Sequence, residues 1–278
     1  MWWPSKGGDM NAGEKGLAVV TGASGGIGLE LARLLAKDGY PLVLAARRLE
    51  VLQQLAEEIH KQYGVSVTPV AVDLSHPDGP AQLFAAVQAL KQPVEILINN
   101  AGFGIYGPFA QSSPEKTQAL LRLNIAALTH LTHLFLPEML QQNRGRILQV
   151  ASTAAYQPGP LMAVYYASKA YVLNFSEALH CELQGTGVTV TALCPGPTKT
   201  DFKDRAGLGD TPLFSGRDVM GVQPVAQAGY RALLSGRRVV IPGWRNALLA
   251  YLARLVPRRL VMLMVLRLQS SRQLPLRS

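Results

Sequence analysis

Cysteine and charge are both scarce in this sequence, and each shortage excludes a class of protein. Only Cys181 and Cys194 occur among the 278 residues, so we expect two buried, reduced thiols in a cytoplasmic protein rather than a disulfide framework. Charged residues make up 16% of the chain and hydrophobic residues 48%. That composition is too apolar for a disordered chain and is sufficient for a packed core.

Acidic residues are missing after Asp218. Ten arginines follow that position: Arg231, Arg237, Arg238, Arg245, Arg254, Arg258, Arg259, Arg267, Arg272 and Arg277. The other 17 basic residues oppose 18 acidic ones, so residues 1–218 carry a net charge of −1 although the whole chain carries +9. The basic character therefore belongs to the last part of the chain and not to its body.

Neither end of the chain has a long uninterrupted apolar run. Residues 1–15 lack the basic head, apolar run and cleavage site of a signal peptide, and we expect a flexible leader there. Residues 244–278 form a basic, apolar extension in which Arg254, Arg258 and Arg259 prevent the ~18 apolar residues of a membrane span. We expect it to pack on the body or a subunit partner, or to lie on an anionic membrane surface. Its arginines occur without a recognised nucleic-acid motif, so we expect no nucleic-acid partner.

Short runs rich in valine, isoleucine and leucine recur along the chain. They cover residues 17–23, 41–47, 66–74, 95–102, 146–152, 189–196 and 237–243. Each is nearly continuous, as is typical of parallel strands covered on both faces. Helix-like segments alternate with them, at residues 26–38, 49–63, 79–90, 113–142 and 163–184. The pattern predicts an α/β fold: a Rossmann-type, doubly wound parallel sheet of about seven strands in the order 3-2-1-4-5-6-7, forming a single domain over residues 16–243.

A glycine-rich turn joins the first predicted strand to the first predicted helix. The stretch TGASGGIG, residues 21–28, contains Gly22, Ser24, Gly25, Gly26, Ile27 and Gly28. A strand, such a turn and a helix in this order direct the helix N–H groups and the positive end of the helix dipole toward a phosphate. The spacing differs from the G-x-G-x-x-G of many dinucleotide sites, so the turn alone leaves cofactor binding and simple tight turning equally open.

Later motifs make the sequence similar to the short-chain dehydrogenase/reductase family. NNAG (99–102), Ser152, YYASK (165–169) and PGPTKT (195–200) follow TGASGGIG in the family's order and spacing, over residues 16–243. The resemblance implies a nicotinamide cofactor held by the glycine turn and by Asp73, Leu74, Asn100, Ala101, Gly102, Tyr165, Lys169, Pro195, Gly196, Thr198 and Thr200. Several of these follow predicted strands, where open α/β sheets bind ligands. Asp73 has an equal alternative as a helix cap or turn former.

Two arginines at the end of the second predicted strand indicate which nicotinamide cofactor is bound. An acid about 20 residues beyond the glycine turn usually binds the ribose of NAD, whereas an arginine accommodates the 2′-phosphate of NADP. Arg47 and Arg48 occupy that place, and no Asp ends the strand. A guanidinium group matches a phosphate in geometry and charge. We therefore expect NADP(H), with a solvated arginine pair as the alternative.

Reduction of a carbonyl by hydride leaves an alkoxide that needs a proton. Free tyrosine has a pKa near 10, and a lysine one helical turn away is expected to lower it. Tyr165 and Tyr166 both lie within one turn of Lys169, and the family's Y-x-x-x-K spacing selects Tyr165. By resemblance Ser152 polarises the carbonyl, with Thr153 as the alternative. The resemblance also implies that Asn124 holds a water linked to the lysine.

The resemblance places a mobile lid over the substrate at about residues 201–221, with Phe202, Leu208, Leu213 and Phe214 as its apolar side. The expected substrate contacts are Ser152, Phe103, Tyr106, Leu161, Met162 and Phe202. His130 and His133 are one helical turn apart, but no acidic cluster surrounds them, so we expect no metal site.

These observations predict an NADPH-dependent oxidoreductase that reduces an apolar ketone or aldehyde, or oxidises the corresponding alcohol. The resemblance implies a homodimer or homotetramer. The alternative is a non-catalytic NADPH-binding interaction or sensor protein that has kept the fold. The presence of all four expected catalytic residue types disfavours this alternative.

Overall fold

The computed structural model describes residues 15–209, 211–212 and 219–270. In it, the seven apolar runs form the strands of one parallel sheet. The strands are β1 (Leu17–Thr21), β2 (Leu42–Ala46), β3 (Val67–Ala71), β4 (Val94–Asn99), β5 (Gly145–Val150), β6 (Val188–Leu193) and β7 (Val239–Val240). Their order is β3-β2-β1-β4-β5-β6-β7 and every neighbouring pair is parallel, as predicted. The central strands are buried on both faces, which explains their continuous apolar runs.

Most strands end before the predicted boundary because the residues beyond them turn into loops. Thr21 ends β1, and the next residue, Gly22, has a φ of 64° that continues no strand. Pro69 lies within β3, which is an edge strand where a missing N–H donor is tolerated. The loops that carry the predicted motifs therefore begin at the strand ends.

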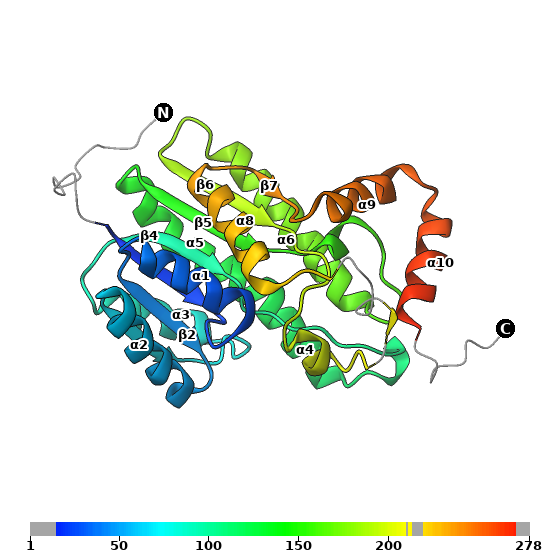
Figure 1. Ribbon diagram of the computed structural model, residues 1–278, viewed down its shortest axis with the longest axis horizontal. Helices are drawn as coiled ribbons and strands as arrows, with labels where there is room; N and C mark the ends of the chain where they lie inside the picture. The colour runs from blue at the N-terminus through cyan, green and yellow to red at the C-terminus, as the bar shows by residue number, and fades with distance from the viewer. Residues whose placement is uncertain (1–14, 210, 213–218, 271–278) are drawn as a thin grey trace.

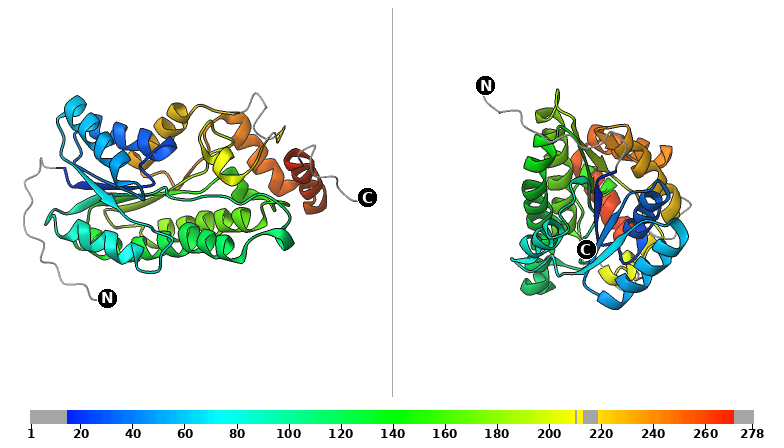
Figure 2. Two further views of the ribbon diagram at one scale, coloured as in Figure 1. Left: turned by 90° about the horizontal axis from the view of Figure 1, so that it is seen from below. Right: turned by 90° about the vertical axis from the view of Figure 1, so that its left-hand side faces the viewer.

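Helices cover both faces of the sheet (Figures 1 and 2). One layer consists of α1 (Gly26–Lys37), α2 (Leu49–Tyr63) and α8 (Val222–Leu234). The other consists of α3 (Gly79–Gln88), α4 (Pro114–Leu121), α5 (Leu128–Gln141) and α6 (Ala163–Glu182). Sequence patterning did not predict α8. A Cβ atom on its Gly229 would lie 2.7 Å from the side chain of Leu193 in β6. Glycine weakens a helix, but at this position it allows α8 to pack closely on the sheet.

The helix predicted over 113–142 is not continuous. A π-helical turn, η2 (Arg122–Ala127), separates α4 from α5 and contains the buried Asn124. By length and composition alone the run Pro114–Gln141 could cross a membrane, with a mean hydropathy of 1.3. In the fold its residues Leu120, Phe135 and Met139 are fully buried against the rest of the molecule, as in a core helix.

The segment after β6 is anchored at both ends. Thr198 and Met220 form an isolated parallel bridge, and between them lies the short helix α7 (Phe202–Ala206). Residues 210 and 213–218 of the predicted lid, including Leu213 and Phe214, lie outside the described residues, as do residues 1–14 of the predicted leader. Lys15, the last leader residue, donates a hydrogen bond to the carbonyl of Asp38.

Two further helices, α9 (Trp244–Leu255) and α10 (Arg258–Gln269), follow β7 and are separated at Pro257. They lie together at one end of the molecule (Figure 1). Ala250 of α9 packs with Tyr156, and Val261 and Val265 of α10 are buried in a cluster beside α6. The described part of the C-terminal extension thus packs on the body, one of the two arrangements expected. Arg272 and Arg277 lie outside the described residues.

Both cysteines are free thiols, as expected. Cys194 is buried after β6, but Cys181 is exposed on α6. The expectation that both are buried is wrong, because Cys181 lies on the solvent side of the last turn of its helix.

Candidate functional site

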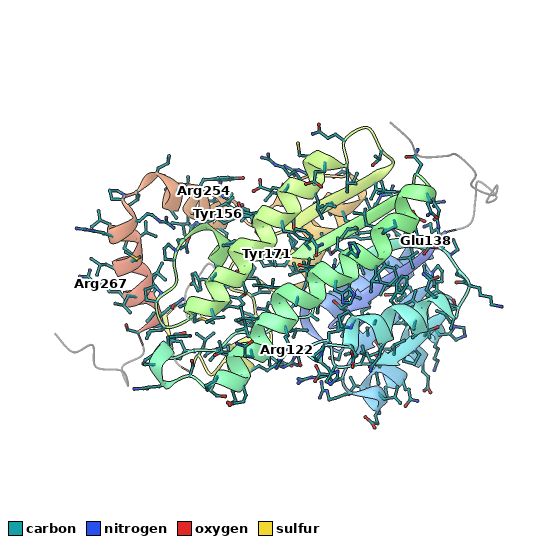
Figure 3. All side chains as sticks on the ribbon, turned by 180° about the vertical axis from the view of Figure 1, so that it is seen from behind. Arg122, Glu138, Tyr156, Tyr171, Arg254 and Arg267 are labelled. Atoms are coloured by element: carbon teal, nitrogen blue, oxygen red, sulfur yellow. The ribbon has the colours of Figure 1, made fainter. Side chains whose placement is uncertain are left out.

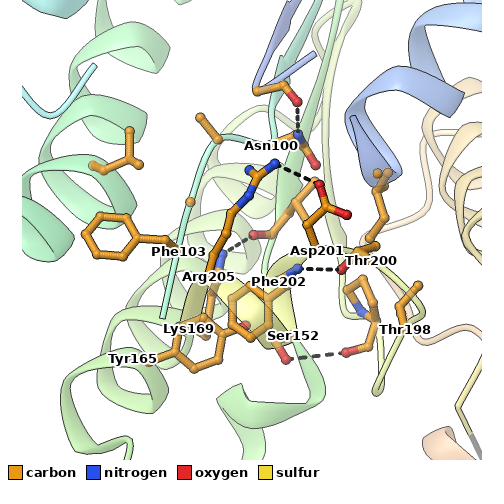
Figure 4. Close-up of a pocket in the computed structure, with 18 of the residues that line it drawn as sticks. Asn100, Phe103, Ser152, Tyr165, Lys169, Thr198, Thr200, Asp201, Phe202 and Arg205 are labelled. Atoms are coloured by element: carbon orange, nitrogen blue, oxygen red, sulfur yellow. Dashed lines mark hydrogen bonds and ion pairs between the residues drawn. The ribbon is translucent and has the colours of Figure 1, made fainter. Parts of the chain in front are cut away.

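A cavity of about 740 Å³ lies beyond the carboxyl ends of the strands. Its volume is in the range of small-molecule and cofactor sites. Almost all residues predicted from the glycine turn and the later motifs line it. Figure 4 shows Ser152, Tyr165 and Lys169 gathered in one part of this cavity, with Asn100 farther along it. Parallel strands bring these residues together because all their carboxyl ends meet at one edge.

The glycine turn has two kinds of glycine. Gly28 allows close packing, since a Cβ on it would lie 2.4 Å from Asn100 Nδ2 and 2.5 Å from the carbonyl oxygen of Gly22. Gly28 itself does not line the cavity. Gly25, by contrast, faces open space at the start of α1, and no side chain caps that helix. The first N–H groups of α1 are therefore directed at the cavity, an arrangement that suits an anion.

Asn100 holds the turn in place from β4. Its Nδ2 donates hydrogen bonds to the carbonyls of Thr21, at 2.9 Å, and Gly22, at 3.2 Å. Thr21 Oγ1 accepts hydrogen bonds from the backbone N–H groups of Asn100 and Ala101. The motif after β4 is thus a support of the turn as well as part of the cavity wall.

Arg47 and Arg48 lie exposed at the edge of the cavity, after β2. Asp73 lies near them and accepts hydrogen bonds from the backbone N–H and the hydroxyl of Ser75, at 2.9 and 2.6 Å. Partial burial would raise the pKa of Asp73, but these hydrogen bonds and the charge of Arg47 lower it below the usual value. Asp73 is therefore both a turn former and part of the cavity wall, so both expected roles are compatible with its position.

The segment after β6 supplies the opposite wall through Pro195, Gly196, Thr198 and Thr200. Gly196 is backed by α9, because a Cβ on it would lie 2.6 Å from the side-chain amide of Asn246. The C-terminal extension thus contributes directly to the support of the cavity, which the sequence pattern did not indicate.

Tyr165 and Ser152 both line the cavity, and the hydroxyl of Ser152 lies close enough to that of Tyr165 to lower its pKa. Ser152 Oγ donates a hydrogen bond to the carbonyl oxygen of Pro195, at 3.3 Å. Ser152 Oγ also accepts a hydrogen bond from the N–H of Ala154, at 3.1 Å, and caps the 3₁₀ turn η3 (Thr153–Tyr156). Thr153 lines the cavity, but its N–H is bonded to the carbonyl of Pro195. The proximity to Tyr165 therefore favours Ser152 over Thr153.

Lys169 is 6% exposed, and its Nζ donates to the carbonyl oxygen of Val150, at 2.7 Å. That Nζ lies 5.8 Å from the ring centroid of Tyr165. Burial lowers the pKa of Lys169 to about 8. Burial also raises the pKa of Tyr165 to about 12, against the effect of the Ser152 hydroxyl. The expected lowering of the tyrosine pKa is not found here, because burial of the hydroxyl dominates and only Ser152 acts in the lowering direction.

Tyr166 also lines the cavity, but its hydroxyl is hydrogen-bonded outside the group of Ser152, Tyr165 and Lys169. Its hydroxyl accepts a hydrogen bond from Gln269 Nε2 at 2.5 Å, and its side chain is almost fully buried. Tyr106 donates to the carbonyl oxygen of the same Gln269, also at 2.5 Å. Sequence analysis gave no sign of Gln269, because a contact across 103 positions leaves no local pattern.

Asn124 is hydrogen-bonded to the loop after β4 and to α6. Its Oδ1 accepts from the N–H of Phe103, and its Nδ2 donates to the carbonyl of Phe103 and to Ser168 Oγ. A Cβ atom on Gly102 would lie 3.0 Å from Asn124 Oδ1 and 3.5 Å from Lys169 Nζ. The side chains of Asn124 and Lys169 are therefore close to each other. Asn124 does not line the cavity, and its visible role is to position the loop after β4.

The wall near Tyr165 is apolar. Phe103, Met162 and Phe202 line it as predicted, and Leu208 joins them. The ring of Phe202 in α7 lies 5.1 Å from that of Tyr165. Two predicted contacts, Tyr106 and Leu161, do not line the cavity. Tyr106 is turned toward Gln269, and Leu161 adopts a φ of 67° in the turn before α6.

Polar residues of the lid segment that sequence analysis missed also line the cavity. Arg205 and Asp201 form an ion pair at 3.0 Å, visible in Figure 4, one helical turn apart. Gln157 lines another part of the wall. In the part of the chain that the structure describes, no group of three His, Cys, Asp or Glu side chains could hold a metal ion.

Comparison with known proteins agrees with the motifs and the geometry. Residues 16–209 match the model of the family described as short chain dehydrogenase. The chain belongs to the short-chain dehydrogenase family. This is a family of oxidoreductases, and its Rossmann-type sheet is the fold seen here.

The curated relatives in the short-chain dehydrogenase family match only part of their own length to this chain. A very-long-chain 3-oxoacyl-CoA reductase of Anas platyrhynchos is 36% identical over 184 residues, covering 64% of this chain and 58% of the relative. The first four curated relatives are matched over only 53–62% of their length.

Two solved structures of this family are similar over most of the chain. A short-chain dehydrogenase from Sphingobium yanoikuyae in complex with NADPH has a TM-score of 0.77 and 32% identity, covering 86% of this chain and 94% of the other. A bulky-bulky ketone specific alcohol dehydrogenase from Comamonas testosteroni has a TM-score of 0.73 and 28% identity, covering 86% and 92%.

Proposed function

We propose that this short-chain dehydrogenase is an NADP(H)-dependent enzyme that reduces an apolar ketone or aldehyde, or oxidises the corresponding alcohol. The observation that carries the proposal is that Ser152, Tyr165 and Lys169 line one cavity together with the glycine turn. The glycine turn and the two arginines at its other wall support a dinucleotide, and the NADPH complex of the Sphingobium relative supports NADP(H).

The residues fit this cofactor. The uncapped N-terminus of α1 and the open side of Gly25 leave room and N–H donors for the pyrophosphate. Arg47 and Arg48 are exposed at the cavity edge where a 2′-phosphate would be bound. When bound, NADPH supplies a hydride to the carbonyl carbon.

The protein's own groups then provide a proton and hold the substrate. Ser152 donates a hydrogen bond to the carbonyl oxygen, where negative charge develops. Tyr165, whose pKa of about 12 keeps it protonated at neutral pH, transfers its proton to that oxygen and leaves a phenolate. The ammonium group of Lys169 stabilises this phenolate by its positive charge. In the oxidation direction the same proton returns to Tyr165.

An apolar substrate is supported by the wall that Phe103, Met162, Phe202 and Leu208 form beside Tyr165. The bulky ketones named for the Comamonas relative and the long-chain acyl substrate named for the avian relative have the same character. We infer a homodimer or homotetramer from the family resemblance, which size-exclusion chromatography with light scattering tests. The scarcity of cysteine supports a cytoplasmic location, with peripheral membrane contact through the C-terminal extension as a further expectation.

The test of the proposed reaction is NADPH consumption with a panel of apolar ketones and aldehydes. Tyr165→Phe should lower kcat at least a hundredfold and leave NADPH affinity nearly unchanged, because only the proton donor is lost. Tyr166→Phe is the matched control and should keep turnover, since its hydroxyl is bonded to Gln269. An active Tyr165→Phe variant, or a dead Tyr166→Phe variant that is still folded, would contradict the assignment.

A further inference from the structure

The outer faces of α9 and α10 carry most of the exposed large apolar side chains of the described residues. Ten of the fourteen lie there: Trp244, Leu248, Leu249, Tyr251, Leu252, Leu255, Leu260, Leu263, Met264 and Leu268. We call these ten residues the outer apolar face. Leu255 is 80% exposed and Trp244 is 72% exposed. Scattered apolar residues are normal on a protein surface, but such a concentration on two adjacent helices marks an interaction site.

The buried residues of α9 and α10 differ from those of the outer apolar face. In α9 the buried residues are Asn246 and Ala250, and in α10 they are Val261, Val265 and Gln269. Most of the exposed apolar residues of α9 lie opposite its buried residues, and those of α10 lie on both sides of its buried stripe, with Leu268 directly beside it. The inner faces therefore account for most of the attachment of the two helices to the body. Within the outer apolar face, Tyr251 contacts the ring of Tyr156 and Trp244 contacts Arg245, and the other members are exposed in the described chain.

Positive charge accompanies the outer apolar face. Arg254, Arg258, Arg259 and Arg267 are exposed on the same two helices, and Figure 3 shows Arg267 on α10 at the edge of the molecule. Within the described ranges, none of these four arginines forms an ion pair with a carboxylate. The sequence has no acidic residue after Asp218 that could neutralise them.

We propose that the outer apolar face of α9 and α10 docks the protein on the surface of an anionic lipid bilayer, without spanning it. Apolar side chains enter the boundary between headgroups and acyl chains, and the arginines bind the anionic headgroups. A second copy of the chain is a poorer occupant, because a two-fold contact through this face would bring arginines against arginines. The combination of apolar and purely basic surface matches an anionic bilayer in both respects.

The position of the face links it to the cavity. Val261 and Val265, on the inner side of α10, pack with Tyr166, Met162 and Leu208, which form the apolar cavity wall. Docking would thus bring the apolar end of the cavity to within about one helix of the lipid. For the reaction proposed above, this favours carbonyl compounds that partition into membranes. The docking itself does not depend on that reaction.

The experiment is co-sedimentation of the full chain with phosphatidylcholine vesicles, with and without phosphatidylglycerol, at low and high salt. We expect binding to the anionic vesicles at low salt, weaker binding at high salt, and little binding to pure phosphatidylcholine. No substrate or cofactor is present, so the result is independent of enzymatic activity. Absence of binding to anionic vesicles at low salt would overturn the proposal.

Variants separate the docking face from general electrostatic attraction. Arg258→Gln with Arg259→Gln should weaken vesicle binding roughly thirtyfold, from about 1 kcal/mol for each basic residue. Arg231→Gln with Arg237→Gln is the matched control, since it removes the same charge from exposed positions on other elements. Equal weakening by both pairs would overturn the assignment of the face.

Apolar substitutions test the second component. Leu255→Ser with Leu263→Ser should reduce binding to anionic vesicles at both salt concentrations, whereas Leu49→Ser with Leu234→Ser, exposed elsewhere, should not. Size-exclusion chromatography of the same variants tests the competing occupant. An oligomer that dissociates in Leu255→Ser with Leu263→Ser, together with unchanged vesicle binding, would show that the face joins copies of the chain instead.

Discussion

Tyr165 and Tyr166 are neighbours on α6, yet their hydroxyls have different surroundings. The hydroxyl of Tyr165 lies beside Ser152 in the cavity, and that of Tyr166 accepts a hydrogen bond from Gln269 of α10. Consecutive helical residues differ by about 100° in direction, so a single step along the chain separates a proton donor from a wall residue. At the residue scale, function is decided by which way a side chain is directed.

The buried Lys169 leads to a prediction about pH. Its pKa of about 8 means that it loses its charge as the pH rises through 8, whereas Tyr165 stays protonated until about 12. Because the charge stabilises the phenolate left by proton transfer, kcat/KM for reduction should be constant at low pH and fall above about pH 8. Lys169→Arg, if active, should move this fall to higher pH, since arginine keeps its charge. Pre-steady-state reduction rates that stay constant up to pH 10 would contradict this role.

A second prediction at this scale concerns Arg47 and Arg48. Replacing both with alanine should weaken NADPH binding about ten- to hundredfold, from the loss of a charge-assisted contribution of about 1.5–3 kcal/mol in total. NADH affinity, which involves no 2′-phosphate, should hardly change and serves as the internal control. Fluorescence titration of both cofactors measures the ratio. Equal affinities for NADPH and NADH in the unchanged protein would refute the assignment.

Local motifs made most of the candidate site predictable. The glycine turn, Ser152, Tyr165 and Lys169 could be found because each lies at a fixed distance from a strand end or from another residue of the same helix. The pKa of Tyr165 could not be predicted, since it depends on burial by distant segments such as Phe202. Contacts between segments far apart in the sequence have no periodicity that a single sequence reveals.

At the scale of elements, the order of strands was predictable and the C-terminal helices only in part. The π-helical turn η2 was missed because its cause is tertiary: the side chain of Asn124 is bonded to the loop at Phe103. The basic, apolar character of residues 244–278 was visible in the sequence, but which side of α9 faces the body was not. Helix α10 packs behind the apolar wall of the cavity through Val261 and Val265, which show no polar signal of a site.

The hydrogen bond between Gln269 and Tyr166 gives a prediction for α10. Gln269→Leu leaves the buried Tyr166 hydroxyl without its donor and should lower the free energy of unfolding by about 1–3 kcal/mol. Tyr166→Phe should cost a similar amount by leaving the Gln269 amide unpaired. The double variant should be more stable than the sum of the two losses implies, because both polar groups are then removed. Urea denaturation of the four proteins measures this coupling, and strict additivity would mean that the bond contributes nothing.

At the scale of the whole molecule, the two ends of the sheet serve different purposes. The carboxyl ends of the strands carry the cavity, and the opposite end carries a buried charge cluster. Glu95, at the start of β4, is 3% exposed and accepts hydrogen bonds from Arg144 at 2.6 Å, Arg146 at 2.9 Å and the N–H of Gly16 at 3.1 Å. These contacts connect β1, β4 and β5 far from the cavity-lining loops. The division predicts that stability and activity can be changed separately.

Glu95→Gln tests this division. Loss of the buried carboxylate leaves two arginines without their charged partner and should lower the free energy of unfolding by roughly 2–3 kcal/mol. This loss is smaller than in a fully buried ion pair, because both arginines are partly exposed to solvent. Glu58→Gln, which removes an exposed partner of Arg33, is the matched control and should cost less than about 1 kcal/mol. At a temperature where all proteins are folded, KM and kcat of Glu95→Gln should equal those of the unchanged enzyme. A large rise in KM without loss of stability would mean that the cluster acts on the cavity through the sheet, because β4 is the strand that connects the two ends.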